Sequence, residues 1–397
     1  MTNNRPITLC VFILAVFWQP FSLAAVTVID KDASPLEISI SGVYVDDINP
    51  TIEQSLGAYG AVIAPKGKLV ASFEGAQLLL DYSAELARFK MQDDTELLEP
   101  KQDFDTYNVK LLTRFFLSSA WHIDAYIEHL DKTQRFGTGI SQLRDDVFKA
   151  DKLKQNKGAA SLVYGSDTSS RYIAVSAFTS KITYQPINDY SSFFDIAEQG
   201  VEFDLAFKQS DFSSLLFRLA LTDEDFVSDE RQDSQVYQGL LGMSWLPGGK
   251  TKLEALIGMY SREFENQDAS SGLSWAVDLS TEPSESWLIE FKSARFSGLS
   301  KSEITSNSVE QNVELRLTYK ASERWHFGMQ ASAGNTEFTE VESTSELDET
   351  RAELNVALNL KEHSKLLFSV GMHDQSYDNE AVEYQQGEVR LMWHVSL

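Results

Sequence analysis

Hydrophobic and polar residues alternate with a period of two along most of this chain. Between positions 352 and 360, every even position holds alanine, leucine or valine, and the odd positions between them include Glu353, Asn355 and Asn359. Residues 201–207 and 313–319 alternate in the same way. Because successive side chains of a β-strand point to opposite faces, this pattern predicts strands with one apolar and one polar face. No stretch sustains a 3.6-residue period, so helices are expected to be nearly absent.

Short polar turns and longer acidic links alternate between the predicted strands. The short turns are 74–77, 118–121, 246–250, 321–324 and 361–364. The long links include 92–105, 137–156, 222–233 and 340–349. This arrangement predicts about 18 strands in hairpins of roughly 40 residues each, with about 16 as the alternative count. No linker-like segment divides the chain, so residues 36–397 are predicted to form one unit.

A repeat of about 40 residues also suits a soluble β-propeller. Two features count against a propeller: no blade motif recurs, and short and long connectors alternate strictly. A barrel in an outer membrane accounts for both features, because each strand pairs with its neighbours and no edge is left in hydrocarbon. The predicted fold class is therefore all-β, a transmembrane antiparallel up-and-down barrel with short periplasmic turns and long acidic extracellular loops.

The chain ends inside a predicted strand, "EVRLMWHVSL" at 388–397. In a barrel this last strand must close onto the first one, here 36–45, and its apolar face must meet lipid. The C-terminal strand of such barrels is also the part that the assembly machinery recognises, usually through a terminal aromatic residue, a preference from which this chain departs. The predicted lipid face of this assembly strand is Val389, Leu391, Trp393, Val395 and Leu397.

Residues 1–25 predict a secretory signal peptide. Arg5 is their only charged residue, and the apolar run at 7–18 is shorter than the ~20 residues of a membrane-spanning helix. A retained membrane anchor is the alternative. Residues 26–35 would then form a short periplasmic segment. Cys10, the only cysteine, lies in the apolar run, so the mature chain has no thiol for a disulfide or a metal site, and no cofactor or metal is predicted.

Beyond residue 25 the chain carries 33 basic and 59 acidic residues. Nucleic acid is excluded as a partner, because its binding requires clustered lysine and arginine to displace counterions. The expected partners are outer-membrane lipid, lipopolysaccharide and the barrel-assembly machinery. Acidic loop residues such as Asp46, Asp47 and 223–225 could ligate calcium, but none matches an EF-hand loop, and a solvated acidic surface is the preferred interpretation.

His394 and Ser396 are the strongest catalytic candidates. Outer-membrane phospholipases and lipid A deacylases use such an H-x-S pair, which must face the membrane to reach lipid. Here the lipid-facing parity belongs to Trp393 and Val395, so His394 and Ser396 are predicted to point into the lumen as ordinary polar residues. No catalytic residue is predicted, and an enzyme that modifies lipid or polymer remains the alternative.

The inward parity carries charge of both signs. These groups could select solutes as charged rings do in pores, or they could pair across strands and brace a wide barrel, and the two interpretations are compatible. The link at 137–156 is the longest and is the best candidate for a constriction. The lumen-lining candidates are Lys110, Arg114, Asp124, Glu128, Glu202, Asp204, Arg218, Glu254, Arg262, Glu290, Lys292, Glu314, Arg316, Arg351 and Glu353.

Aromatic residues near the predicted strand ends are expected to form girdles at the two membrane interfaces. They are Tyr107, Trp121, Tyr237, Trp245, Trp287, Trp325 and Tyr377.

Four segments give the chain a family resemblance: "GVYVDDIN" (42–49), "LLLDYSAELARF" (78–89), "FDTYNVKLLTRFFLSSAWHIDAYIEH" (104–129) and "SWLPGGKTKLEALIGMYSREFEN" (244–266). With them the chain resembles the β-barrel porin 2 family, which includes outer-membrane proteins of exopolysaccharide biosynthesis operons. The resemblance implies a non-enzymatic, porin-like barrel associated with exopolysaccharide or capsule production or export, with polysaccharide and export components as further partners. It supplies no catalytic residues. A structural or adhesive surface barrel is the remaining alternative.

Overall fold

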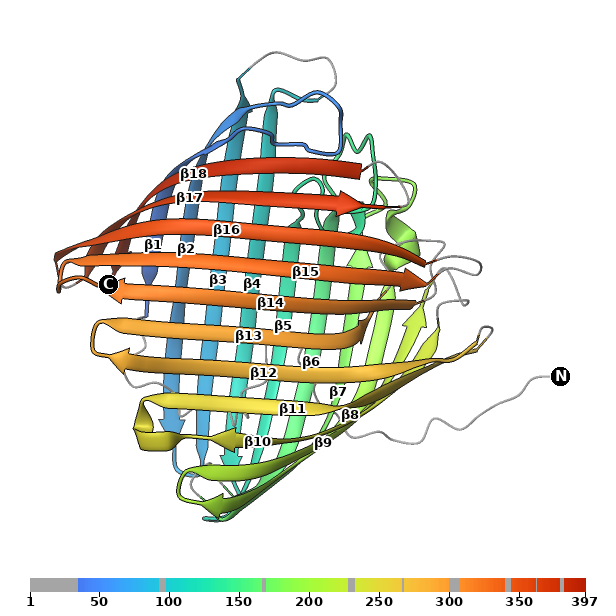
Figure 1. The fold of residues 1–397 in the computed structure, drawn as a ribbon, viewed down its shortest axis with the longest axis vertical. Helices are drawn as coiled ribbons and strands as arrows, with labels where there is room; N and C mark the ends of the chain where they lie inside the picture. The colour runs from blue at the N-terminus through green and yellow to red at the C-terminus, as the bar shows by residue number, and fades with distance from the viewer. Residues whose placement is uncertain are drawn as a thin grey trace.

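All the strands of the computed structural model belong to one sheet, which closes on itself as a barrel (Figure 1). The structure describes residues 35–92, 98–165, 169–227, 233–265, 268–299, 307–339, 344–361, 363–378 and 382–397. The strands are β1 (Glu37–Val45), β2 (Ala58–Phe73), β3 (Ala76–Met91), β4 (Lys101–Phe116), β5 (Trp121–Thr133), β6 (Lys152–Tyr164), β7 (Arg171–Tyr184), β8 (Ile196–Ser210), β9 (Ser213–Phe226), β10 (Ser234–Trp245), β11 (Thr251–Phe264), β12 (Ser270–Ser284), β13 (Trp287–Gly298), β14 (Asn307–Lys320), β15 (Trp325–Thr339), β16 (Thr344–Lys361), β17 (Ser364–Tyr377) and β18 (Val382–Ser396).

Each strand pairs antiparallel with its neighbours in the chain, and β1 closes the barrel against β18 from Glu37 opposite Ser396 to Val45 opposite Glu388. Closure pairs the described strands all the way around the barrel, which is the condition for a sheet to survive in hydrocarbon. The end of β2, residues 67–73, extends past β1 and pairs with β3 alone. The predicted all-β, up-and-down transmembrane barrel of 18 strands is confirmed, and the alternative of 16 strands is wrong.

Connectors at one end of the barrel are short and most of those at the other end are longer (Figure 1), with the β15–β16 and β17–β18 connections as short exceptions. Several predicted loop boundaries are nevertheless wrong: β6 already begins at Lys152, β9 continues to Phe226, and β16 begins at Thr344. The physical reason is visible at Asp223 and Asp225, where the outer face turns polar while strand pairing goes on. Beyond the apolar belt both faces meet water, so the alternation fades before the strand ends.

The outer face of the barrel carries a belt of exposed apolar residues. On β10, Tyr237, Leu241, Met243 and Trp245 point outward and are about half exposed. These positions span about 27 Å of strand, or about 21 Å along the barrel axis at a tilt of ~40°, which is close to the apolar band of ~25 Å in outer-membrane barrels. Outward tryptophans gather at the short-turn end: Trp121, Trp245, Trp287, Trp325 and Trp393.

Tyr377 differs from the predicted girdle residues, because it points inward and is buried against Phe338. Its hydroxyl lies 3.0 Å from the Ser345 hydroxyl. The girdle prediction is wrong for this residue because the connection at 134–151 packs against the inner wall here, so the inward-facing side chain of Tyr377 lies in a packed core.

Residues 1–34 lie outside the described part of the chain, so the signal peptide at 1–25 and most of the segment at 26–35 stay predictions. Within the described ranges, no helix is long and apolar enough to cross a membrane.

Candidate functional site: a constriction in the lumen

The connection between β5 and β6, residues 134–151, folds into the barrel, and we call it the constriction loop. It contains a short 3₁₀ turn at Gly139–Ser141. Its side chains contribute to two buried apolar clusters on the inner wall. Phe136 and Val147 pack with residues of β1–β4, including Val43 and Phe104. Leu143 packs with Phe338, Leu347, Tyr377 and Tyr384 of β15–β18.

Hydrogen bonds join the constriction loop to β17 and β18. Gln142 Nε2 donates to Gln375 Oε1 (3.1 Å), and Gln375 Nε2 donates to the Gln142 carbonyl oxygen (2.7 Å). The Tyr384 hydroxyl is within hydrogen-bonding distance of both the Gly137 carbonyl oxygen and Gln375 Oε1. Because Gln375 is only 1% exposed, each of these bonds is shielded from water and costly to lose.

Two neighbouring loops hold the constriction loop from its other sides. Asn49, in the β1–β2 connection, donates from Nδ2 to the Val147 carbonyl oxygen at 2.7 Å. The Arg144 guanidinium lies 3.8 Å above the centre of the Tyr190 ring, in the β7–β8 connection. Asp151 accepts hydrogen bonds from Asn188, Tyr190 and Ser191 in that same connection. The loop is therefore anchored at several points rather than hanging freely in the lumen.

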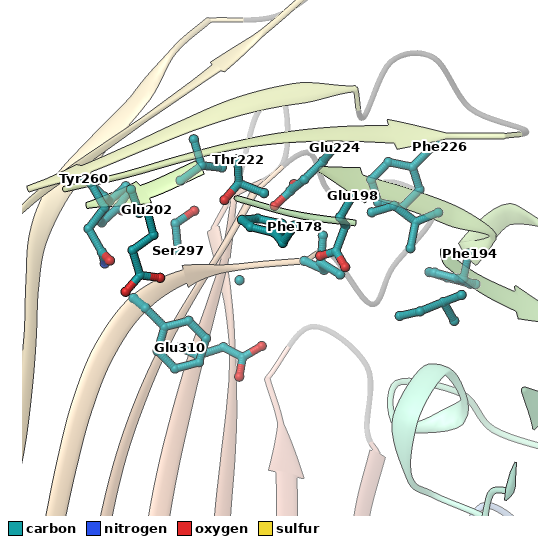
Figure 2. A pocket seen from close by; sticks show the side chains of 18 of the residues that line it. Phe178, Phe194, Glu198, Glu202, Thr222, Glu224, Phe226, Tyr260, Ser297 and Glu310 are labelled. Atoms are coloured by element: carbon teal, nitrogen blue, oxygen red, sulfur yellow. The ribbon is translucent and has the colours of Figure 1, made fainter. Parts of the chain in front are cut away.

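A cavity of about 370 Å³ remains between the Gly139–Ile140 turn and a facing wall formed by residues of β7–β11, β13 and β14 (Figure 2). Aromatic side chains, among them Phe178, Phe226 and Tyr260, supply much of its surface. The residues that line the cavity lie in the half of each strand nearest to the longer connections, at the same height as the constriction loop. Its charged lining residues are Glu198, Glu202, Arg218, Glu224 and Glu310.

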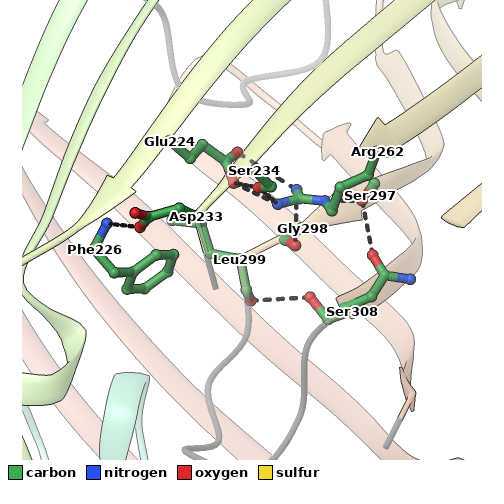
Figure 3. A network of polar contacts seen from close by, with 10 residues as sticks. Glu224, Phe226, Asp233, Ser234, Arg262, Ser297, Gly298, Leu299 and Ser308 are labelled. Atoms are coloured by element: carbon green, nitrogen blue, oxygen red, sulfur yellow. Dashed lines mark hydrogen bonds and ion pairs between the residues drawn. The ribbon is translucent and has the colours of Figure 1, made fainter. Parts of the chain in front are cut away.

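Arg262, on the inner face of β11 next to the cavity, forms a fully bonded network with Glu224 (Figure 3). Its Nη1 donates to Glu224 and to Ser234 Oγ (2.8 Å), its Nε donates to Ser297 Oγ (2.8 Å), and its Nη2 donates to the Gly298 carbonyl oxygen (3.1 Å). The side chains of Arg262 and Glu224 are 3% and 7% exposed. Such a buried pair stays stable because every polar atom of the guanidinium has a partner.

Arg218 is held by two carboxylates on the adjacent strand. Its Nε donates to Asp204 Oδ1 at 2.6 Å and lies 2.9 Å from Glu202 Oε1. Its charge therefore offsets carboxylates of the wall and is not presented to the lumen as an isolated cation.

The other lumen-lining candidates also point inward and mostly pair within the wall. Arg114 binds Asp124 through two bonds of 2.7 and 2.9 Å, Lys110 lies 3.6 Å from Glu128, and Arg316 lies near both Glu290 and Glu314. The remaining members are placed by strand register. Lys292 is opposite Glu314, Glu254 is opposite Asp278, and Glu353 and Arg351 are opposite Gln330 and Ser332. Among these candidates, acidic and basic residues lie next to one another on adjacent strands.

The alternation predicted for the last strand matches its geometry. Val389, Leu391, Trp393 and Leu397 are exposed on the outer face, and Val395 shares their parity. His394 points inward, where its Nδ1 lies 3.0 Å from Ser39 Oγ and its Nε2 lies 3.6 Å from Glu37 Oε2. The partner of His394 is thus Ser39 on β1, which sequence spacing could not identify because the two residues meet only at the barrel seam.

The acidic loop residues do not assemble into a calcium site. Glu224 points inward to Arg262, whereas Asp223 accepts outward bonds from Gln199 and Gln235. Asp47 accepts backbone hydrogen bonds from Asn49 and Leu56, and burial raises its pKa. In the described ranges no group of three or more histidine, aspartate or glutamate side chains is placed to hold a metal ion.

Sequence comparisons do not place the chain in a family: no protein-family model matches it, and no curated protein matches it either. Several solved outer-membrane proteins are similar in structure. A BenF-like porin from Pseudomonas fluorescens Pf-5 has a TM-score of 0.48 and 12% identity over 93% of this chain and 100% of that one. OccAB3 from Acinetobacter baumannii has a TM-score of 0.48 and 11% identity over 92% and 98%. OpdK from Pseudomonas aeruginosa has a TM-score of 0.46 and 10% identity over 92% and 100%.

At these TM-scores the likeness carries no functional conclusion. The class of the protein follows from its own geometry: a closed 18-stranded antiparallel β-barrel with an apolar outer belt, a charged interior and a loop folded into the lumen.

Proposed function

We propose that this protein is a non-enzymatic outer-membrane pore that passes small solutes through a lumen narrowed by the constriction loop. One observation carries the proposal: side chains alternate between an apolar outer belt and a charged inner wall, and the loop occupies only part of the space within. A barrel of about 18 strands is too wide for its own wall side chains to fill, so water enters wherever loops do not.

In this proposal the short turns lie in the periplasm and the longer connections face outward, as is general for bacterial outer-membrane barrels. Lipid and lipopolysaccharide would contact the outer belt. The barrel-assembly machinery would recognise β18 through its outward residues, including Trp393 and Leu397.

The association with exopolysaccharide or capsule rests on the family resemblance alone. The cavity beside the constriction loop, about 370 Å³, lies at the lower end of the ~300–1,000 Å³ range of small-molecule sites. That volume favours a small solute over a thick polymer as the cargo.

Planar-bilayer recording of the purified barrel tests the proposal. We expect stable unitary currents, and swelling of barrel-containing liposomes in small sugars that declines steeply as sugar size increases. A barrel that is shown to be inserted and yet is electrically silent and impermeable would overturn a pore and favour the surface-structural alternative.

The enzymatic alternative has a separate test at Ser39 and His394. We expect no hydrolysis of phospholipid, lipid A or polysaccharide by the wild-type barrel. Hydrolysis that disappears in both Ser39→Ala and His394→Ala would overturn the non-enzymatic assignment.

A further inference from the structure

The lining of the cavity beside the constriction loop contains more acid than base. Four glutamates line it, two on β8, one on β9 and one on β14, and Arg218 is the basic residue among the described lining residues. Arg218 already binds Asp204 and Glu202, and Arg262 on the inner face of β11 is ion-paired with Glu224. The cavity therefore holds a negative formal charge that nearby arginines do not balance.

Glu198 is a lining residue with one unsatisfied carboxylate oxygen. It is 5% exposed, and its Oε2 has no hydrogen-bond partner among the described residues, although Ser180 on β7 hydrogen-bonds its carboxylate. Glu224 stands directly opposite it on β9, so two carboxylates share one level of the wall. Lys157 lies two strands away, beyond Ser180, and its charge attracts both Glu198 and Glu128, which is opposite it on β5.

Buried carboxylate oxygens in folded proteins nearly always have a partner, because an unsatisfied one carries its full desolvation cost. A hydrogen-bond donor brought in by a ligand would satisfy Glu198, and a positively charged donor would also relieve its repulsion with Glu224. Figure 2 shows Glu198, Glu202 and Glu310 reaching toward the same space from different parts of the wall.

The rest of the cavity is suited to an apolar body. Phe178, Phe226 and Tyr260 present aromatic surface. Gly200 makes room for the first of these, because a Cβ at that position would come within 2.6 Å of the Phe178 ring. Aromatic faces attract cations as well as apolar groups, so the lining is compatible with both ends of an amphipathic cation.

We propose that this cavity binds a small organic cation, with an ammonium group against Glu198 and an aromatic or alkyl body among Phe178, Phe226 and Tyr260. This proposal rests on the proposed pore function, in which the ligand is a solute held briefly on its way past the constriction loop. The cavity volume suits one small amine rather than a polyamine chain or a sugar polymer.

Isothermal titration calorimetry on the full barrel in detergent tests this site with benzylamine, benzyl alcohol and benzoate as probes. We expect saturable binding of benzylamine, much weaker binding of the alcohol, and none of benzoate. Glu198→Gln should weaken benzylamine binding by about tenfold or more, since it replaces a charge-assisted hydrogen bond by a neutral one. The matched control is Glu263→Gln, which removes the same charge from the exposed outer face of β11 and should leave the affinity unchanged.

Equal binding of benzylamine and benzyl alcohol, or an unchanged affinity in Glu198→Gln, would overturn the cation site. If Glu198→Gln does not fold, Glu310→Gln on the facing strand replaces it and should also weaken benzylamine binding. Recording currents from the same preparations separates the two proposals. Conduction without selective amine binding refutes only the cation site, whereas amine binding by a silent barrel refutes only the pore.

Discussion

The inner wall of this barrel has two sides that differ at the level of the constriction loop. On β15–β18 and β1–β4 the wall carries buried apolar residues, such as Phe338 and Val43, that pack against the loop. On β8–β11 the wall at the same level carries Glu198, Glu224 and Arg262 and borders a cavity. The comparison shows that one loop, by packing against one side of the wall, fills that part of the lumen and leaves a cavity on the other side.

The largest effect is expected from removing the loop that creates this difference. Replacing residues 138–147 by a short glycine–serine linker should raise single-channel conductance several-fold, because the narrowed part of the lumen then opens to water. The β5–β6 pairing from Trp121 opposite Tyr164 to Thr133 opposite Lys152 should hold the wall together. Far-ultraviolet circular dichroism checks that the barrel still folds. A folded variant with wild-type conductance would show that the loop does not limit the passage.

The next largest effect should come from the buried ion pair of the cavity side. Arg262→Ala leaves Glu224 buried without its partner, so we expect the free energy of unfolding to fall by about 3–5 kcal/mol. Arg316→Ala is the control: that arginine is also ion-paired and inward-facing, but its side chain is 48% exposed, and the expected loss is below about 1 kcal/mol. Urea unfolding followed by tryptophan fluorescence measures both. Equal losses of unfolding free energy in the two variants would contradict the distinction between a buried ion pair and a solvent-exposed one.

A smaller effect is expected where the filled side binds the loop. Gln375→Ala removes the partner of Gln142 and Tyr384 inside the barrel and should cost about 1–3 kcal/mol. It should also increase current noise, because the loop then moves more freely. Gln235→Ala, on the exposed outer face, is the control and should change neither quantity. Quiet currents in a destabilised Gln375→Ala barrel would show that other contacts suffice to hold the loop.

The smallest effect concerns the acid in the β1–β2 connection that borders the filled side. Burial raises the pKa of Asp47, so its charged form is disfavoured in the folded loop. Loop stability should therefore be highest below the pKa of the unfolded chain and should decline as pH rises through the folded pKa. Hydrogen exchange of the Ile48 amide, which bonds to the Leu56 carbonyl oxygen at 2.8 Å, reports this decline after correction for intrinsic exchange.

Asp47→Asn should remove this pH dependence, because the amide oxygen can still accept the same backbone bonds without carrying charge. Asp211→Asn, in an exposed turn at the opposite end of the barrel, should leave it in place. Protection that increases with pH in the wild type would reverse the sign that we expect.

Much of the fold could be predicted from the sequence because strand alternation is a local property. The parity of residues 351–360 and 388–397 predicts which side chains point outward, and the structure places Leu354, Leu391 and Trp393 on the outer face. The loop boundaries could not be predicted equally well, because strand pairing extends past the belt in which the two faces differ.

The candidate site was only partly accessible from the sequence. The charged residues of the wall could be identified by parity, but Glu198 could not be singled out, because whether its Oε2 has a partner depends on its neighbours on β7 and β9. The constriction loop was indicated by length alone, and the inward position of Tyr377 was missed because the loop's path covers it.

The sequence by itself determined the barrel, an approximate strand number and the two faces of its wall, since these follow from a two-residue period and from the spacing of turns. Only the tertiary structure decided which part of the lumen is filled. The deciding contacts join residues far apart in the chain, such as Gln142 with Gln375 and Gly137 with Tyr384. Closing the barrel is what brings them together, so no local pattern of residues can encode the choice.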